Sequence, residues 1–210
     1  MSGRGIFITF EGIEGSGKST QFGLLAEALG KRDLPLVVLR EPGGTPIGDQ
    51  VRGILLAPEL AEMTAEAEAL LYAASRAQLV REMIEPALAE DRIVLCDRFL
   101  DSSIAYQGYG RGLPEDFVLA INKSAQEIRP DVTFLLDIDA RVGLSRATTA
   151  GADRMEQLEL SFHERVRAGY LELARRDPGR FRVLDGVLPI DDLGKRILVE
   201  VESRLPAGGR

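Results

Sequence analysis

The chain has 210 residues, a formal net charge of −7 and one cysteine. This length fits one domain that buries a substantial apolar core without disulfides or metal ions, so we expect a single domain over residues 1–210. Acidic and basic residues alternate along the chain. Binding a nucleic acid or a polybasic membrane site needs clustered Lys and Arg, and we therefore expect neither partner.

Two further observations concern the compartment. No segment approaches the ~18 consecutive apolar residues of a membrane span, and the first residues lack the apolar core of a signal peptide. Cys96 stands alone in an apolar run, where a buried structural thiol is the expected interpretation. We expect a cytoplasmic protein.

His163, the only histidine, lies in a polar helical stretch and is expected at the surface, which disfavours histidine-based catalysis or metal binding.

Short apolar runs alternate with helical patterns along the chain. Residues 6–10 predict a buried strand, and residues 19–29 repeat apolar side chains at helical spacing until Gly30. Four later runs also resemble buried strands: residues 36–39, 93–96, 132–136 and 181–184. This alternation predicts an α/β fold with a parallel sheet, helices on both faces and ligands at the carboxyl ends of the strands.

A glycine-rich loop lies between the first strand and the first helix. Residues 12–19 match the pattern G-x-x-x-x-G-K-[ST], whose backbone N–H groups surround phosphate oxygens. Lys18 is then expected to reach the β- and γ-phosphates, and Ser19 to offer its hydroxyl to Mg²⁺. The predicted nucleoside triphosphate site comprises Gly12, Ile13, Glu14, Gly15, Ser16, Gly17, Lys18, Ser19 and Thr20.

The longest helical stretch covers residues 64–89 and carries apolar side chains on more than one face. A helix of this kind is usually buried on two sides, and a second copy of the chain is the simplest second partner. Pro86 is expected to kink or end the helix.

Two segments are expected to lack regular structure. Residues 148–153 are small and polar, as in a mobile lid or an ordinary loop, and composition favours the loop. A flexible tail is expected at about residues 205–210.

A second charged motif follows the strand at residues 93–96. Asp97 and Arg98 should lie beside the phosphate loop, because the carboxyl ends of parallel strands meet at one edge. The guanidinium of Arg98 suits a phosphate, whereas Asp97 would hold Mg²⁺ or cap the next helix. The alternative for Arg98 is a purely structural salt bridge.

These motifs carry a family resemblance. Residues 95–108 resemble the signature of thymidylate kinases, and the family's other motifs follow in order at residues 10–12, 40–45, 48–56 and 153–156. The resemblance covers roughly residues 5–200 and implies a P-loop NTPase fold with five parallel strands and a short lid at about residues 146–156. It further implies a homodimer that transfers the γ-phosphoryl group of ATP to dTMP with Mg²⁺.

The resemblance also implies roles for individual residues. Arg98 and Arg52 would hold the phosphate of dTMP, Tyr72 would stack on thymine, and Arg76 would donate to the O4 carbonyl of the base. Without the resemblance, Tyr72 would be interpreted as a core aromatic residue. Contacts to the base and sugar would come from Ser103, Tyr106 and Gln107, with Tyr106 excluding a 2′-hydroxyl.

Glu14 places an acidic residue inside the phosphate loop, as in bacterial members that use lid arginines for catalysis. It would contact the 3′-hydroxyl of dTMP or a water bound to Mg²⁺. Only Arg146 and Arg154 flank the expected lid, and Arg154 is expected to contribute more.

Three alternatives remain. The first is a kinase for another nucleoside monophosphate, and the second is a nucleotide switch, although residues 122–125 lack the final Asp of N-K-x-D. The third is a homodimeric interaction module with a vestigial site.

Overall fold

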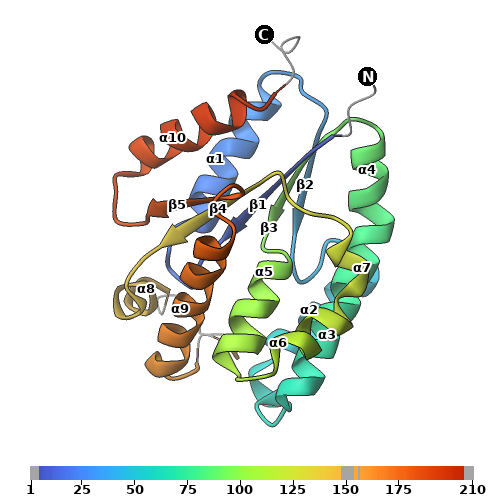
Figure 1. Cartoon of the computed structure of the whole chain (residues 1–210), viewed down its shortest axis with the longest axis vertical. Helices are drawn as coiled ribbons and strands as arrows, with labels where there is room; N and C mark the ends of the chain where they lie inside the picture. The colour runs from blue at the N-terminus through green and yellow to red at the C-terminus, as the bar shows by residue number, and fades with distance from the viewer. Residues whose placement is uncertain (1–4, 148–153, 156, 206–210) are drawn as a thin grey trace.

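The computed structural model describes residues 5–147, 154, 155 and 157–205 (Figure 1). Most of the expected lid, residues 148–153 and 156, and the expected tail at 206–210 lie outside the described residues. None of the helices within the described ranges is both long enough and apolar enough to cross a lipid bilayer.

Five parallel strands form one sheet in the order β2-β3-β1-β4-β5. The predicted α/β architecture is confirmed, and every predicted strand is present. The strands are β1 (Ile6–Glu11), β2 (Leu36–Arg40), β3 (Ile93–Asp97), β4 (Val132–Asp137) and β5 (Phe181–Asp185).

Helices connect the strands and cover both faces of the sheet. The α-helices of the described residues are α1 (Lys18–Gly30), α2 (Pro46–Leu56), α3 (Ala65–Leu79), α4 (Glu85–Ala89), α5 (Leu100–Ser103), α6 (Glu115–Ile121), α7 (Lys123–Gln126), α8 (Ala140–Ala147), α9 (Leu160–Arg176) and α10 (Ile190–Glu202). A 3-10 turn, η1 (Pro58–Leu60), and two π-helical segments, η2 (Val80–Ile84) and η3 (Ile104–Gly110), complete the set.

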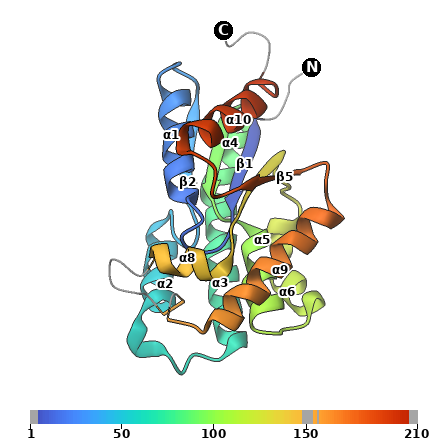
Figure 2. The ribbon, with the colours of Figure 1, turned by 90° about the vertical axis from the view of Figure 1, so that its left-hand side faces the viewer.

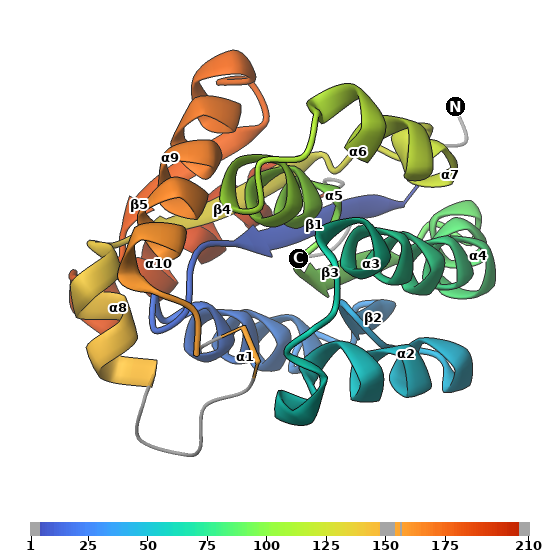
Figure 3. The same ribbon diagram turned by 90° about the horizontal axis from the view of Figure 1, so that it is seen from below.

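Alternation of side chains along the strands builds a core on each face. On β1, Ile8 and Phe10 pack with α1 and α10, whereas Phe7 points to the other face and packs with η2 and α4. That second face also carries α5, η3 and α9, as the end-on view shows (Figure 3). Cys96 is fully buried in this core, as expected for a structural thiol. Strands covered on both faces are apolar throughout, which explains the short apolar runs.

The helix predicted at residues 64–89 forms, but Pro86 does not end it. Helical structure continues from α3 through the π-helical segment η2 into α4, and Pro86 lies in the first turn of α4. In η2 the N–H of Glu85 donates to the carbonyl of Val80, five residues earlier. This wider turn rearranges the hydrogen-bond ladder just before the proline, which cannot donate.

The fold brings functional side chains to one end of the molecule. β1 begins and α10 ends at the end opposite α2 and α8 (Figure 2). Because all five strands are parallel, their carboxyl ends meet near α2 and α8, at the point where polar residues follow each strand.

Candidate active site

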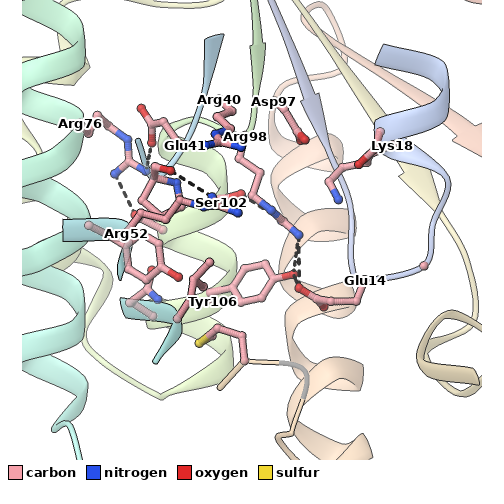
Figure 4. A pocket seen from close by; sticks show the side chains of 18 residues that line it. Glu14, Lys18, Arg40, Glu41, Arg52, Arg76, Asp97, Arg98, Ser102 and Tyr106 are labelled. Carbon is pink, nitrogen blue, oxygen red and sulfur yellow. Dashed lines mark hydrogen bonds and ion pairs between the residues drawn. The ribbon is translucent and has the colours of Figure 1, made fainter. Parts of the chain in front are cut away.

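A cavity of about 380 Å³ opens at the carboxyl ends of β1, β2 and β3. Residues from the phosphate loop, α2, α3, β3 and η3 line it (Figure 4). The predicted site residues that it brings together are Glu14, Gly15, Lys18, Ser19, Arg52, Tyr72, Arg76, Asp97, Arg98, Ser103, Tyr106 and Gln107. Gly12, Ile13, Ser16, Gly17 and Thr20 belong to the same loop and to the start of α1 without lining the cavity.

The phosphate loop requires its glycines for steric reasons. Gly15 has a φ of 67°, and a Cβ there would lie 2.0 Å from the carbonyl oxygen of Gly143 on α8. Gly17 has a φ of 90° and precedes α1, whose N-terminus has no side-chain cap. The N-terminal N–H groups of α1 and their partial positive charge are therefore not engaged by a capping side chain, as in a site for an anion.

Lys18, Ser19 and Asp97 line the end of the cavity that lies beside the phosphate loop. Burial and the charge of Arg98 lower the pKa of Lys18, while Asp97 and Glu14 oppose that shift. Asp97 is the last residue of β3, and its buried Oδ1 has no hydrogen-bond partner among the described residues. A buried carboxylate oxygen without a donor, beside a serine hydroxyl and a lysine, is suited to a hard cation.

Arg98 is held at the centre of the cavity by contacts from several elements. Its backbone φ of 70° is unusual for a residue with a side chain, and its N–H donates to the carbonyl of Phe10 at 2.9 Å. Nη1 donates to the carbonyl oxygen of Gly12 at 3.0 Å and to the hydroxyl of Tyr170 at 3.0 Å. The strained backbone and the full set of contacts fix the guanidinium direction before any ligand binds.

Glu14 faces Arg98 across the cavity, as the dashed lines in Figure 4 show. Its Oε1 accepts from Tyr106 at 2.6 Å and from Arg98 at 3.2 Å, and its Oε2 lies 3.1 Å from Nδ1 of His163. Burial opposes ionisation of Glu14, but the hydrogen bond from His163 and the charges of Arg98 and Lys18 lower its pKa to about 2. Glu14 is therefore a carboxylate at neutral pH.

The surface position predicted for His163 is wrong. The side chain is fully buried on α9, against the phosphate loop. The buried positions of α9 are Phe162, His163, Val166, Gly169, Tyr170, Leu173 and Ala174, which follow helical spacing. The polar neighbours of His163 in the sequence hid this pattern, although the three- and four-residue spacing could have placed it on the inner face.

Arg76 lies at the opposite end of the cavity from the phosphate loop (Figure 4). It forms a buried ion pair with Glu41 at 2.5 Å and donates to the hydroxyl of Ser103 at 2.8 Å and to Oδ1 of Asn122 at 2.6 Å. Its Nε, which is also buried, has no hydrogen-bond partner in the described part of the chain. Burial raises the pKa of Glu41 to about 7 despite the opposing charge of Arg76.

Arg52 and Tyr72 line the cavity between α2 and α3. Arg52 donates to the carbonyl oxygen of Pro42 at 3.0 Å. Gln107, from η3, donates to Glu68 at 2.9 Å. These contacts fix the walls of the cavity near Arg76.

The two arginines that flank the expected lid do not line the cavity. Arg154 is buried, with Nη1 2.7 Å from Glu68 and Nε donating to the carbonyl of Leu55 at 2.8 Å. Arg146 donates to the carbonyl of Gly186 at 3.3 Å. Their catalytic roles stay a prediction, because the segment between them lies outside the described residues.

No role was predicted for several buried partners of Arg98 and Arg76. Glu11 accepts from Ser102 at 2.6 Å and from Tyr170 at 2.8 Å, and both hydroxyls also contact Arg98. Burial and the charge of Asp101 raise the pKa of Glu11 to about 7. The ends of β1 and β2 carried the signal for Glu11 and Glu41, since polar residues there follow apolar strands. Tyr170 gave no comparable signal, because it lies far along the chain on α9.

Comparisons with known proteins agree on one family. The family model for thymidylate kinase matches residues 10–197. Thymidylate kinases of Geobacter sulfurreducens and Geotalea daltonii are 52% and 50% identical to the chain, each over 96% of it and over 99% and 98% of their own lengths. The crystal structure of thymidylate kinase from Ehrlichia chaffeensis superposes with a TM-score of 0.77 at 35% identity, covering 95% of this chain and 99% of that chain. The chain therefore belongs to the thymidylate kinase family.

Proposed function

We propose that the protein transfers the γ-phosphoryl group of ATP to dTMP and forms dTDP and ADP. The observation that carries this proposal is the layout of the cavity, with the phosphate loop at one end, the buried Arg76 at the other and Arg98 between them (Figure 4). A nucleoside monophosphate can then face a triphosphate with the two phosphates near Arg98. Phosphoryl transfer needs mainly such positioning and charge stabilisation.

At the donor end, the triphosphate would bind the loop N–H groups, the N-terminus of α1 and Lys18. Mg²⁺ would be held by Ser19 and Asp97, and it would neutralise charge on the β- and γ-phosphates. The unpartnered Oδ1 of Asp97 supports this assignment.

At the acceptor end, the phosphate of dTMP would bind Arg98 and Arg52, and thymine would lie against Tyr72 near Arg76. The unpartnered Nε of Arg76 supports a hydrogen bond to the O4 carbonyl, because a buried donor without an acceptor carries a cost that the base would remove. Cytosine, with an amino group at that position, would leave this donor unpaired. Tyr106 lies beside Glu14 and would occupy the space of a 2′-hydroxyl.

Glu14 would accept from the 3′-hydroxyl of dTMP or from a water bound to Mg²⁺. Its pKa of about 2 suits an acceptor of hydrogen bonds at neutral pH. A general base is not needed, since the attacking phosphate of dTMP is already an anion.

The alternative is a kinase for another nucleoside monophosphate, which would share the same fold and donor end. A coupled assay of ADP release with dTMP, dUMP, CMP, AMP and GMP separates the two functions. We expect dTMP to give the highest kcat/KM. A preference for CMP or a purine would favour the alternative, and no turnover with any of them would favour a vestigial site.

We further propose a cytoplasmic homodimer that forms largely through residues 64–89, the stretch that contains α3, η2 and α4. Leu70 on α3 is 51% exposed, and Ile47 and Ile54 on the neighbouring α2 are 55% and 44% exposed. These exposed apolar side chains lie on two helices that pack together, and burying them would stabilise a dimer. Light scattering at micromolar concentration should give the mass of a dimer, and Leu70→Glu should shift it towards a monomer. A monomeric wild-type chain would contradict this proposal.

A further inference from the structure

The direction of the Glu14 carboxylate is set by donors that lie outside the phosphate loop. Arg98 and Tyr106 bond Oε1 and line the cavity, so both are exposed to an incoming ligand. The third donor, His163, bonds Oε2 from α9 and does not line the cavity. The side chain of Glu14 is thus held from two sides, and only one of them faces the cavity.

Among the described residues, the imidazole ring of His163 makes one hydrogen bond, to Glu14. The side chain is fully buried, and the ring of Phe162 packs against it edge-on with centroids 5.4 Å apart. Nε2 has no hydrogen-bond partner among the described residues, so the contact of Nδ1 with Glu14 is the ring's polar interaction. Glu14 also accepts from Arg98 and Tyr106, as a carboxylate does. A carboxylate oxygen only accepts, so Nδ1 must carry the proton of this contact.

We propose that His163 is a positioning residue for the phosphate loop: its Nδ1–H fixes Oε2 of Glu14 so that Oε1 stays directed into the cavity. When a substrate engages Arg98 and Tyr106, these two donors can exchange Glu14 for the ligand. The hydrogen bond from His163 remains, because its donor lies outside the cavity. An uncompensated carboxylate in the loop would otherwise be free to turn towards Lys18, which belongs to the donor end.

The kinetic consequence rests on the proposed function, in which Glu14 contacts the sugar of dTMP or a metal-bound water. Losing a hydrogen bond to a charged group should lower kcat/KM for dTMP by roughly 10- to 100-fold. KM for ATP should change less than about threefold, because the triphosphate binds the loop backbone and Lys18. A merely structural role would disturb both substrates together.

The geometry can be tested without any assay of activity, because His163 is the only histidine of the chain. In protein labelled with ¹⁵N-histidine, with any affinity tag removed, the imidazole signals report this ring alone. We expect a protonated Nδ1 at pH 7, and a clear change of its shift in Glu14→Ala. A ring protonated at Nε2 only, or a spectrum that Glu14→Ala leaves unchanged, would overturn the proposal even if the enzyme phosphorylates dTMP.

A double-mutant cycle tests the functional coupling. His163→Leu should lose its roughly 10- to 100-fold effect when Glu14 is already alanine, falling to less than about twofold. His163→Asn, which keeps an N–H near the position of Nδ1, should recover most of the loss. Val166→Ala is the matched control, since Val166 is fully buried on the same helix face and should act equally in both backgrounds.

Two results of the cycle would count against His163 as a positioning residue. One is an equal loss for His163→Leu with and without the Glu14 side chain. The other is an equal loss for His163→Leu and His163→Asn. If wild-type protein fails to use dTMP at all, the proposed function falls, while the NMR result still decides whether His163 holds Glu14.

Discussion

The pKa values of the glutamates at the site depend on the side chains that surround each carboxyl group. Glu11 is fully buried and the side chain of Glu14 is 11% exposed, yet the pKa of Glu14 falls to about 2 whereas that of Glu11 rises to about 7. Burial acts in the same direction on both groups. The difference comes from the partners, because His163, Arg98 and Lys18 outweigh burial at Glu14, while Asp101 adds a negative charge beside Glu11.

The lowered pKa of Glu14 predicts a pH-dependent contribution to stability. The pKa of Glu14 is about 2 in the folded protein, against an ordinary value of 4.5 for a glutamate. Ionised Glu14 therefore stabilises the folded state above pH 4.5, and this stabilisation is lost as the pH falls from 4.5 towards about 2. The full contribution is on the order of 3 kcal/mol. In urea unfolding from pH 7 to pH 3, the stability difference between wild type and Glu14→Gln should shrink below pH 4.5. A difference that does not change with pH would contradict the assignment.

Arg76 allows a sharper test of base recognition. Arg76→Gln should raise KM for dTMP much more than KM for ATP, with a loss in kcat/KM of about 10- to 100-fold. Because the substitution also leaves the buried Glu41 unpaired, it should lower stability. The double variant Arg76→Gln with Glu41→Gln is the control, since it removes the unpaired charge. Recovery of stability without recovery of KM for dTMP is the expected outcome, and equal effects on both substrates would indicate a structural role.

At the scale of elements, the strands and the phosphate loop could be predicted from the sequence, and the contacts between distant helices could not. Runs such as residues 93–96 are apolar because both faces are covered, and the loop glycines follow from local steric demands. Of the two outcomes predicted for Pro86, an end of the helix is wrong, because the π-helical turn that accommodates the proline has no local signature in the sequence. His163 and Tyr170 reach the site only through the packing of α9 against η3. Pairings at such sequence separation depend on tertiary structure, so their partners were not predictable.

Arg154 contacts both α2 and α3, and this predicts an effect of its removal on stability. Arg154 lies near the end of the expected lid and pairs with Glu68 on α3. Glu68 also pairs with Arg111 at 2.8 Å. Arg154→Ala should cost up to about 3 kcal/mol of stability, with Arg111 limiting the loss. Arg146→Ala should cost less, because Arg146 bonds a backbone carbonyl. Chemical denaturation of both variants measures this difference.

The catalytic part of that prediction is separate from stability. Arg154 is expected to contribute more to kcat than Arg146, because a positioned arginine can be worth ~10³–10⁵ in phosphoryl transfer. The test is kcat at saturating ATP and dTMP, with folding checked by circular dichroism. If each variant loses less than about fivefold, roughly 1 kcal/mol of barrier, the lid arginines are not catalytic. Lys18, Arg98 and Mg²⁺ would then have to suffice.

At the scale of the whole molecule, the cavity has two ends that belong to different parts of the fold. The proposed donor end is formed by the loop after β1 and the start of α1, and the proposed acceptor end by α2, α3 and η3. Arg98, directly after β3, lies between them (Figure 4). Binding at one end should therefore survive damage at the other, provided that Arg98 and Glu14 keep their places.

Lys18→Ala tests this separation of the two ends. The variant should abolish phosphoryl transfer, because it removes the charge proposed to face the β- and γ-phosphates, while the proposed acceptor residues on α2 and α3 are unchanged. Ligand binding to the folded state should still stabilise it, by about 2.7 kcal/mol at a dTMP concentration of 100 times Kd. Thermal unfolding with and without dTMP measures this stabilisation. Arg76→Gln is the converse control, because it should keep stabilisation by ATP and lose stabilisation by dTMP.

If Lys18→Ala kept near-normal turnover, the phosphate-loop assignment would be wrong. If it lost the response to dTMP as well, the two ends would form one coupled site, and the charge of Lys18 would be needed to hold Glu14 and Arg98 in place for the acceptor.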